Sequence, residues 1–217
     1  DVTCTFKNTR KAHITIKKQV LPQGNATDKF TFTGLGGFEL KDGDATDAWV
    51  SPSAGAQVVE ETGLPAGYVL DSIDCGGSTA AVVSGSKVTV TPAAGGNVTC
   101  TFKNGIKPKL TLKKVIDPSS DSGKFDLWAK NPAGANVITG GTARGHGQSS
   151  DTVTVAANTA YALGETANPS GDAGKYDMGV PTCDGGTLTG SSLKLGYGDD
   201  VTCTFKNTRK AHITIKK

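Results

Sequence analysis

The chain repeats itself, and this repeat limits its possible folds more than any other feature. Residues 1–18, DVTCTFKNTRKAHITIKK, recur without a change at 200–217. A third copy at 97–114, NVTCTFKNGIKPKLTLKK, matches the first at 11 of 18 positions. Recurrence at offsets of 96 and 103 residues indicates tandem structural units built on one plan. The sequence therefore predicts two diverged domains and an overlap of 18 residues into a further repeat.

The domain borders are expected inside each copy of the repeat. A copy contains two alternating segments, Val-Thr-Cys-Thr-Phe-Lys-Asn and Ile-Thr-Ile-Lys-Lys (Leu-Thr-Leu-Lys-Lys in the middle copy), with a short polar stretch between them. Division at that stretch gives domain one at 9–105 and domain two at 106–208. Residues 1–8 are then the last strand of a preceding repeat, and 209–217 the first strand of a following one. The alternative is a chain whose identical ends compete for one place in a sheet.

Short alternating segments between turn residues indicate the fold class. The chain is rich in Thr, Val and Gly, with 29 glycines and one Met, and has no convincing helical periodicity. Strands at this spacing predict an all-β protein of two tandem β-sandwiches. The expected strands are 29–33, 38–40, 57–61, 68–73, 87–90 and 98–102 in domain one, and 125–128, 152–155, 161–163 and 193–195 in domain two.

Composition excludes several classes of function. A net charge of +3, from 23 basic and 20 acidic residues, gives no electrostatic footprint for nucleic acid. No apolar stretch is long enough to span a membrane. There is no Cys-x-x-Cys pair for zinc, and Asp42–Asp47 lacks a Glu to complete a calcium loop, so a turn is expected there. Without a catalytic triad or a metal set, we expect neither an enzyme nor a cofactor.

The five cysteines can be assigned from the repeat. Three of them, Cys4, Cys100 and Cys203, occupy one repeat position, which leaves Cys75 and Cys183, each expected in the strand before the last hairpin of its domain. We expect disulfides Cys75–Cys100 and Cys183–Cys203, with Cys4 pairing to a cysteine of the preceding repeat. Disulfides require an oxidising compartment and hence secretion. The alternative is a cytosolic protein with buried free thiols.

Polar side chains continue the inward-facing rows of the repeated strands. Because side chains alternate along a strand, Lys18 and Lys114 follow apolar residues on one face, as Asn104 does in the last strand. Asn207 is the same repeat position as Asn104. A charged lysine on an inward face is costly unless it is neutralised or reacts. A shift of one residue would instead point Lys17 inward.

A glutamate lies in the same register near the middle of each domain. Glu61 follows Val59 by two residues, and Glu165 follows Leu163 by two residues. Each glutamate therefore shares the face of an apolar neighbour and is expected to point into the core.

These motifs resemble a known family. The runs Val-Thr-Cys-Thr-Phe-Lys-Asn-Thr, Ile-Thr-Ile-Lys-Lys, Glu61-Thr62-Gly63-Leu64-Pro65-Ala66-Gly67-Tyr68 and Leu70-Asp71-Ser72-Ile73-Asp74-Cys75 are similar to prealbumin-like (SpaA and Cna B-type) repeats of bacterial surface proteins, pilins and adhesin stalks. Domain two departs from the pattern at Glu165-Thr166-Ala167-Asn168-Pro169-Ser170-Gly171. The resemblance implies Ig-like or prealbumin-like sandwiches.

The resemblance also implies a covalent cross-link in each domain. Family members often carry a self-formed Lys–Asn isopeptide bond between the first and last strands, assisted by a buried acid. By position, the implied sets are Lys18, Glu61 and Asn104 in domain one, and Lys114, Glu165 and Asn207 in domain two. Asn8 would cross-link to the preceding repeat and Lys217 to the following one.

The expected function is structural. The chain resembles a repeat unit of an extracellular fibre, pilus-like filament or adhesin stalk, attached to a cell surface or cell wall, whose partners are adjacent identical repeats. The alternative is an adhesin module whose Gly-rich loops at 34–37, 140–147 or 184–190 bind a host or surface glycan or protein.

Overall fold

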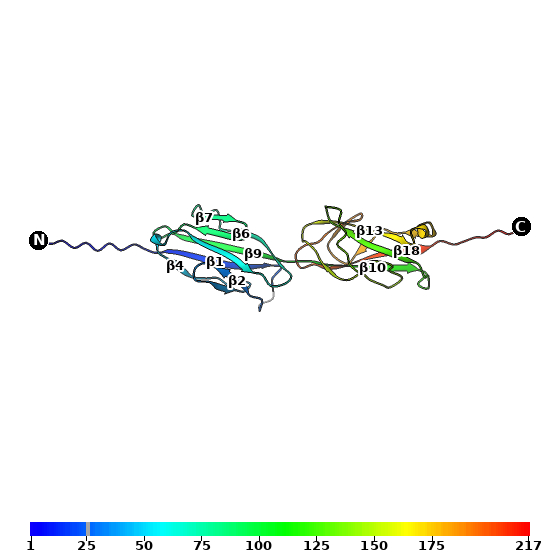
Figure 1. Cartoon of the computed structure of the whole chain (residues 1–217), viewed down its shortest axis with the longest axis horizontal. Coiled ribbons are helices and arrows are strands. Elements are labelled where there is room, and N and C mark those ends of the chain that lie inside the picture. Colours follow the sequence, from blue (N-terminus) through cyan, green and yellow to red (C-terminus); the bar gives the residue numbers. More distant parts are fainter. Residues whose placement is uncertain (25–26) are drawn as a thin grey trace. The chain divides into compact units, whose positions relative to one another are not determined.

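The computed structural model describes residues 1–24 and 27–217 (Figure 1). The chain divides into two compact units, Asp1–Ile106 and Lys107–Lys217, each with its own core. This division lies one residue beyond the border expected from the repeat. We call the folded part of the first unit domain one and that of the second domain two.

Domain one is a sandwich of two sheets. One sheet has the strand order β4-β1-β9-β6, with β4 at Ala48–Val50, β1 at Ala12–Leu21, β9 at Asn97–Ile106 and β6 at Tyr68–Asp74. The other has the order β3-β2-β5-β8-β7, with β3 at Phe38–Leu40, β2 at Phe30–Thr33, β5 at Gln57–Gly63, β8 at Lys87–Val90 and β7 at Ala81–Ser84. A short 3-10 helix, η1, occupies Pro52–Ala54.

Domain two is built in the same way. One sheet has the order β12-β10-β18-β14, with β12 at Val153–Thr154, β10 at Lys109–Asp117, β18 at Asp200–Arg209 and β14 at Tyr176–Met178, and with β15 at Thr182–Cys183 also paired to β18. The other has the order β11-β13-β17-β16, with β11 at Lys124–Lys130, β13 at Ala160–Asn168, β17 at Ser192–Lys194 and β16 at Thr187–Thr189. The 3-10 helix η2 occupies Ser170–Lys175. The predicted all-β fold of two tandem sandwiches is confirmed.

The first and last strands of each domain are neighbours and run parallel. β1 pairs with β9 from His13 opposite Asn97 to Leu21 opposite Gly105, and Figure 1 shows the two side by side. β10 pairs with β18 in the same sense. Because the paired strands are parallel, the chain enters a domain at one end of this ladder and leaves it at the other.

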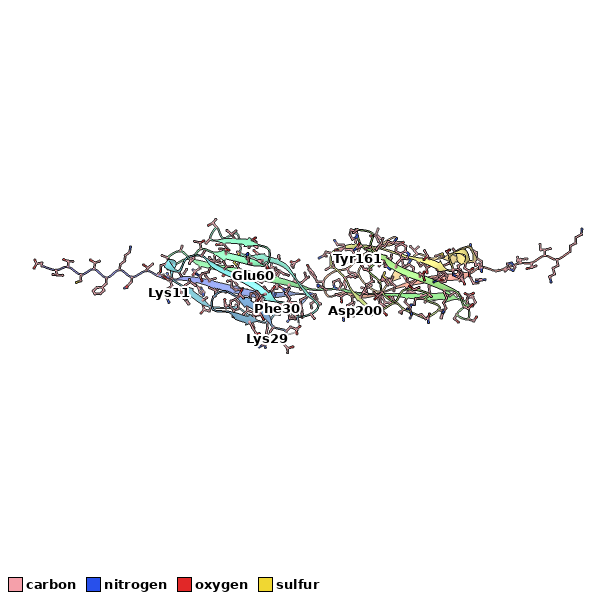
Figure 2. The ribbon with its side chains drawn as sticks, viewed as in Figure 1. Lys11, Lys29, Phe30, Glu60, Tyr161 and Asp200 are labelled. Atoms are coloured by element: carbon pink, nitrogen blue, oxygen red, sulfur yellow. A yellow bond between two sulfur atoms is a disulfide. The ribbon has the colours of Figure 1, made fainter. Side chains whose placement is uncertain are left out.

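Alternating side chains from the two sheets form the core of each sandwich. In domain one, Ile14, Ile16 and Phe102 of the β1–β9 ladder are fully buried. They face the sheet that contains Phe30 and Phe32, which are also buried (Phe30 is labelled in Figure 2). The rings of Phe32 and Phe102 pack edge to face, with their centroids 5.1 Å apart. Each such apolar side chain contributes roughly 1.5–3 kcal/mol when buried. The same alternation buries Leu110, Leu112, Phe125, Leu193, Cys203 and Phe205 in domain two.

The repeated segments at both ends of the chain lie outside these cores. Residues 1–8 and 210–217 belong to no strand and are exposed throughout. Phe6 is 91% exposed and Ile215 is 92% exposed, although their counterparts in β18 and β1 are buried. Their assignment to neighbouring repeats remains a prediction.

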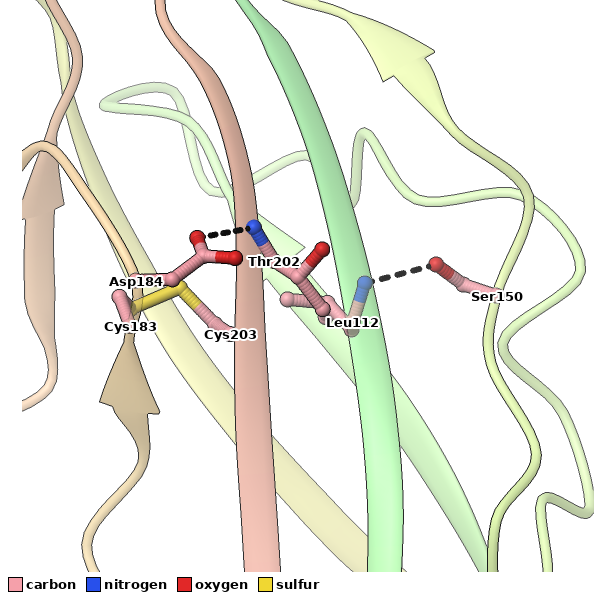
Figure 3. Close-up of a disulfide and its surroundings, with 6 residues drawn as sticks. All are labelled: Leu112, Ser150, Cys183, Asp184, Thr202 and Cys203. Carbon is pink, nitrogen blue, oxygen red and sulfur yellow. Dashed lines mark hydrogen bonds between the residues drawn. A yellow bond between two sulfur atoms is a disulfide. The ribbon is translucent and has the colours of Figure 1, made fainter.

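Disulfides join the last strand of each domain to a nearby segment. The structure links Cys75 to Cys100 and Cys183 to Cys203, which is the pairing expected from the repeat. Figure 3 shows Cys183 of β15 bonded to Cys203 of β18, with the Thr202 backbone N–H donating to Asp184 at 2.7 Å. Cys75 lies just after β6 and not within a strand, because the Gly76–Gly77 turn begins there. Cys4 is exposed with a free thiol.

The disulfide of domain one should stabilise the fold by restricting the unfolded chain. Cys75 and Cys100 are 25 residues apart. Closing a loop of that size is worth about 3 kcal/mol in the chain-entropy model. The double variant Cys75→Ala/Cys100→Ala should therefore lose about that much free energy of unfolding, measured by guanidinium denaturation. Cys4→Ala is the matched control and should change stability by less than about 0.5 kcal/mol; an equal loss in the control would contradict this account.

Candidate functional site

Lys18 points from β1 into the core of domain one. It continues the inward row of Ile14 and Ile16, so its side chain is fully buried while Lys17 is exposed. Its Nζ lies 4.1 Å from the centroid of the Phe30 ring. Burial of a lysine among aromatic and aliphatic side chains requires polar partners, because an unpaired charge there would be strongly destabilising.

Glu61 and Asn104 are those partners. Lys18 Nζ contacts Asn104 Oδ1 and lies 3.2 Å from Glu61 Oε1. Asn104 Nδ2 donates to Glu61 Oε2 at 2.9 Å, so the three side chains close a triangle. Lys18 Nζ also donates to the carbonyl of Phe102 at 3.3 Å. The side chains of Lys18 and Glu61 are fully buried, and Asn104 is inaccessible as well.

Domain two buries the same residue types in the same places. Lys114 Nζ lies 2.7 Å from Glu165 Oε2, and the two side chains are 0% and 4% exposed. Lys114 Nζ also donates to the carbonyl of Phe205 at 3.2 Å and lies 4.3 Å from the centroid of the Phe125 ring. Asn207 is fully buried, and within the described residues neither atom of its carboxamide has a hydrogen-bond partner.

The topology explains why these clusters correspond. Lys18 is opposite Phe102 in the β1–β9 ladder, and Asn104 lies two residues further along on the same face. Lys114 is likewise opposite Phe205, two residues before Asn207. The glutamates come from the other sheet, on β5 and β13. Each cluster therefore combines the first strand, the last strand and a strand of the facing sheet.

Burial changes the acid–base behaviour of both lysines. Removal from water lowers the pKa of Lys18 from its ordinary value, an effect only partly opposed by Glu61 and more weakly by Asp42. Burial lowers the pKa of Lys114 in the same way, opposed by Glu165. A lowered pKa increases the share of neutral amine, which is the nucleophilic form. An amine, a carboxamide and a proton-transferring carboxyl in one dry site can support acyl transfer from the amide to the amine.

In each domain, a loop that the sequence did not assign to the site forms hydrogen bonds with the backbone of the buried lysine. In domain one this loop contains Asp42, Gly43 and Asp44. Lys18 donates its N–H to Asp44 O at 2.9 Å and accepts from Gly43 N at 3.0 Å. The Asp42 carboxylate accepts from Val20 N at 2.7 Å and from Gly24 N at 3.0 Å, so it anchors the expected turn to β1. The Asp42-Gly43 dipeptide predicts a turn, but it does not specify which strand the turn contacts.

In domain two the Gly-rich loop at 140–147 contributes to this role. Gly147 N donates to Lys114 O at 2.8 Å, and Lys114 N donates to Gln148 O at 2.8 Å. His146 Nδ1 lies 2.7 Å from Ile116 O, so the histidine ring is used to attach the loop to β10. The backbone of this loop thus holds the part of β10 that carries Lys114.

The described residues contain no metal-binding cluster of three or more His, Cys, Asp or Glu side chains. Across that same part of the chain, no helix has the length and apolar character needed to cross a membrane.

The lowered lysine pKa values predict a pH effect on any form of the protein that cannot react. In Asn104→Ala/Asn207→Ala, the unfolded chain holds its lysine protons up to about pH 10.4, whereas the folded chain releases those of Lys18 and Lys114 earlier. Between the folded and unfolded pKa values the unfolded state binds more protons, so the contribution of these two lysines to the free energy of unfolding rises with pH. The slope is at most about 1.4 kcal/mol per pH unit for each lysine.

Urea denaturation across alkaline pH measures this effect. The matched control adds Lys18→Met and Lys114→Met to the same background, which removes both buried amines and leaves all other titrating groups. The difference in unfolding free energy between the two proteins should increase with pH. A difference that stays flat or decreases would contradict the assignment of lowered pKa values.

The comparison with family models agrees with the fold. Family models described as a prealbumin-like fold domain match residues 14–106 and 107–205. Among solved structures, the major pilin of Streptococcus pyogenes is 17% identical with a TM-score of 0.34, covering 94% of this chain and 99% of that chain. The shaft pilin SpaA of Lactobacillus rhamnosus GG is 12% identical with a TM-score of 0.31, covering 94% and 100%. The Bacillus anthracis TIE protein is 15% identical with a TM-score of 0.33, covering 92% and 34%.

No curated protein matches the chain. The two family matches lie end to end and together take in most of the sequence. The chain therefore belongs to the prealbumin-like fold domain family, with one such domain in each half.

Proposed function

We propose that the chain is a structural repeat unit of an extracellular bacterial fibre, pilus-like filament or adhesin stalk, in which each domain forms an isopeptide bond between its first and last strands. The observation that carries the proposal is the buried triangle of Lys18, Glu61 and Asn104. An amine and a carboxamide meet there beside the β1–β9 ladder, whose strands lead to the two ends of the domain.

The reaction is an acyl transfer that needs no external reagent. Neutral Lys18 Nζ attacks Asn104 Cγ, a new C–N bond forms, and the bond from Cγ to Nδ2 breaks. Glu61 gives a proton to the departing nitrogen and receives one from the lysine nitrogen, so it ends unchanged while ammonia leaves. Lys114, Glu165 and Asn207 are the corresponding residues of domain two. Each domain reacts once, so this is maturation of a structural protein and not enzymatic turnover.

The bond would alter how a domain bears tension. Because β1 and β9 are parallel neighbours, pulling on the two ends of domain one shears the ladder between them. A bond from Lys18 to Asn104 would carry that force directly and leave residues 19–103 outside the load path. The equivalent bond in domain two would protect residues 115–206. Length and mechanical strength are what a stalk or fibre requires of its repeats.

The repeated termini extend the same plan to neighbouring units. We propose that residues 1–8 complete a preceding domain, with Cys4 and Asn8 forming its disulfide and cross-link. We also propose that residues 210–217, which follow the end of β18 at Arg209, begin a following domain through Lys217. The partners are then adjacent identical repeats of one fibre. The disulfides support an extracellular location at a cell surface or cell wall.

An intact-mass measurement tests the cross-links. The purified chain should be lighter than its sequence mass, corrected for disulfides, by two molecules of ammonia. Lys18→Ala should lose only one, because domain two still reacts, and Lys18→Ala/Lys114→Ala should lose none. Lys17→Ala is the matched control, since this neighbour is exposed, and should lose both.

Intact mass and proteolysis can each contradict the proposed cross-link. If a wild-type chain retains all its ammonia, or separates into free fragments after reduction and cleavage between Lys18 and Asn104, the proposed cross-link is wrong.

A further inference from the structure

We propose that Tyr68 in domain one and Tyr176 in domain two are positioning residues for cross-link formation, each acting through a phenylalanine ring that contacts the lysine amine. Each tyrosine is held by an aspartate that precedes a strand of the facing sheet, and its ring holds the phenylalanine in place. This inference rests on the proposed function, because it assigns further residues to the same reaction.

A phenylalanine ring covers the lysine amine in each cluster. Phe30 of β2 is fully buried, and its ring centroid lies 4.1 Å from Lys18 Nζ. Phe125 of β11 is also fully buried, with its ring centroid 4.3 Å from Lys114 Nζ. A ring at this distance occupies one side of the nitrogen and keeps water away from that side. The position of the ring therefore determines how dry the amine is and how closely its place is fixed.

A tyrosine packs against each of these phenylalanines. The rings of Phe30 and Tyr68 meet edge to face, with their centroids 5.2 Å apart. The rings of Phe125 and Tyr176 meet in the same way, with their centroids 5.0 Å apart. Because edge-to-face contact favours one relative orientation of two rings, each tyrosine fixes the phenylalanine that covers the amine.

Both tyrosines lie at the same point of the fold. Tyr68 of β6 is opposite the residue of β9 that comes two positions after Asn104. Tyr176 of β14 is opposite the residue of β18 that comes two positions after Asn207. Each tyrosine is therefore on the side of its cluster where the last strand ends and the chain leaves the domain.

An aspartate fixes each tyrosine from the side of the facing sheet. The Tyr176 hydroxyl donates to Asp121 at 2.6 Å and accepts from Arg209 at 3.0 Å. Burial raises the pKa of Tyr176, and the hydrogen bond from Tyr176 lowers the pKa of Asp121. The bond thus keeps its donor and its acceptor at neutral pH. In domain one the Tyr68 hydroxyl donates to Asp28.

Loops of different length produce this contact. The aspartate comes two residues before Phe30 in domain one but four residues before Phe125 in domain two. The longer loop requires Gly123, because a Cβ at that position would lie 2.0 Å from the Tyr176 hydroxyl oxygen. Two different loops thus place an aspartate at the same tyrosine, which favours a role of the pair in the site over an accident of one loop.

The variant Tyr176→Phe tests this role, because it removes only the hydroxyl. Chains refolded in acid, where the lysine amines are protonated, are moved to neutral pH, and both cross-linked peptides are followed by mass spectrometry. The Lys114–Asn207 peptide should form roughly tenfold more slowly than in wild type, because a small displacement of a reacting group is costly. The Lys18–Asn104 peptide of the same chain should form at the wild-type rate.

Further variants separate positioning from a general loss of stability. Gly123→Ala keeps the tyrosine but obstructs its hydroxyl, so it should slow the same peptide. Tyr161→Phe is the matched control, because Tyr161 is also buried in domain two but its hydroxyl bonds to the backbone of Ala156. Both peptides should form at the wild-type rate in this control. Tyr68→Phe should reverse the pattern and slow only the peptide of domain one.

An NMR titration measures the same role without any reaction. In the double asparagine-to-alanine variant, the carbon signals next to each amine report the protonation of Lys18 and Lys114. Adding Tyr176→Phe should raise the pKa of Lys114 toward its ordinary value, since burial is what lowers it, and should leave that of Lys18 unchanged. The added substitution retains the charged groups that face Lys114 and Tyr176 in the described part of the chain, namely Glu165, Asp121 and Arg209.

The results distinguish this role from the proposed function. If wild type forms both cross-links but Tyr176→Phe changes neither the rate in domain two nor the pKa of Lys114, the positioning role is wrong and the proposed function stands. A Tyr161→Phe control that slows the domain-two peptide as much as Tyr176→Phe would also overturn the role. If wild type retains its ammonia, the proposed function itself fails, and this role fails with it.

Discussion

Parallel pairing of the first and last strands organises both domains. It brings the two ends of each domain into one ladder, and it aligns a lysine of the first strand with an asparagine two residues beyond its opposite neighbour. The facing sheet supplies a glutamate, so a cation that would be intolerable alone is buried with hydrogen-bonding and ionic partners. The disulfide attaches the same last strand on its other side. The proposed cross-link and its load-bearing role both depend on this ladder.

The two clusters differ in the hydrogen bonds of the asparagine carboxamide. Asn104 is held by both Lys18 and Glu61, so its carboxamide is already polarised and oriented. Among the described residues, Asn207 has no hydrogen-bond partner, although its position in the ladder is equivalent. Glu165 lies 2.7 Å from Lys114, but among the described residues it makes no hydrogen bond to Asn207. Domain one is thus the better organised of the two for the proposed acyl transfer, and it also keeps the Glu-Thr…Pro-Ala-Gly-Tyr run intact.

Much of the site could be read from the sequence because strand alternation and the repeat act together. Alternation alone left Lys17 and Lys18 open, and the structure buries Lys18 because Ile14 and Ile16 must face the core. The Asp42 turn and the 140–147 loop could not be placed, since their role depends on backbone contacts with distant strands. Short strands such as β4 and β14 were also missed, because three residues carry too little pattern to be recognised.

If a covalent bond joins the first and last strands of each domain, tension passes through that bond and not through the chain between them. Pulling a single molecule by its two ends measures this path. We expect that residues 19–103, about 290 Å of extended chain, are never released under reducing conditions, and that residues 115–206 also stay closed. An unfolding step that releases the full length of either domain would contradict it.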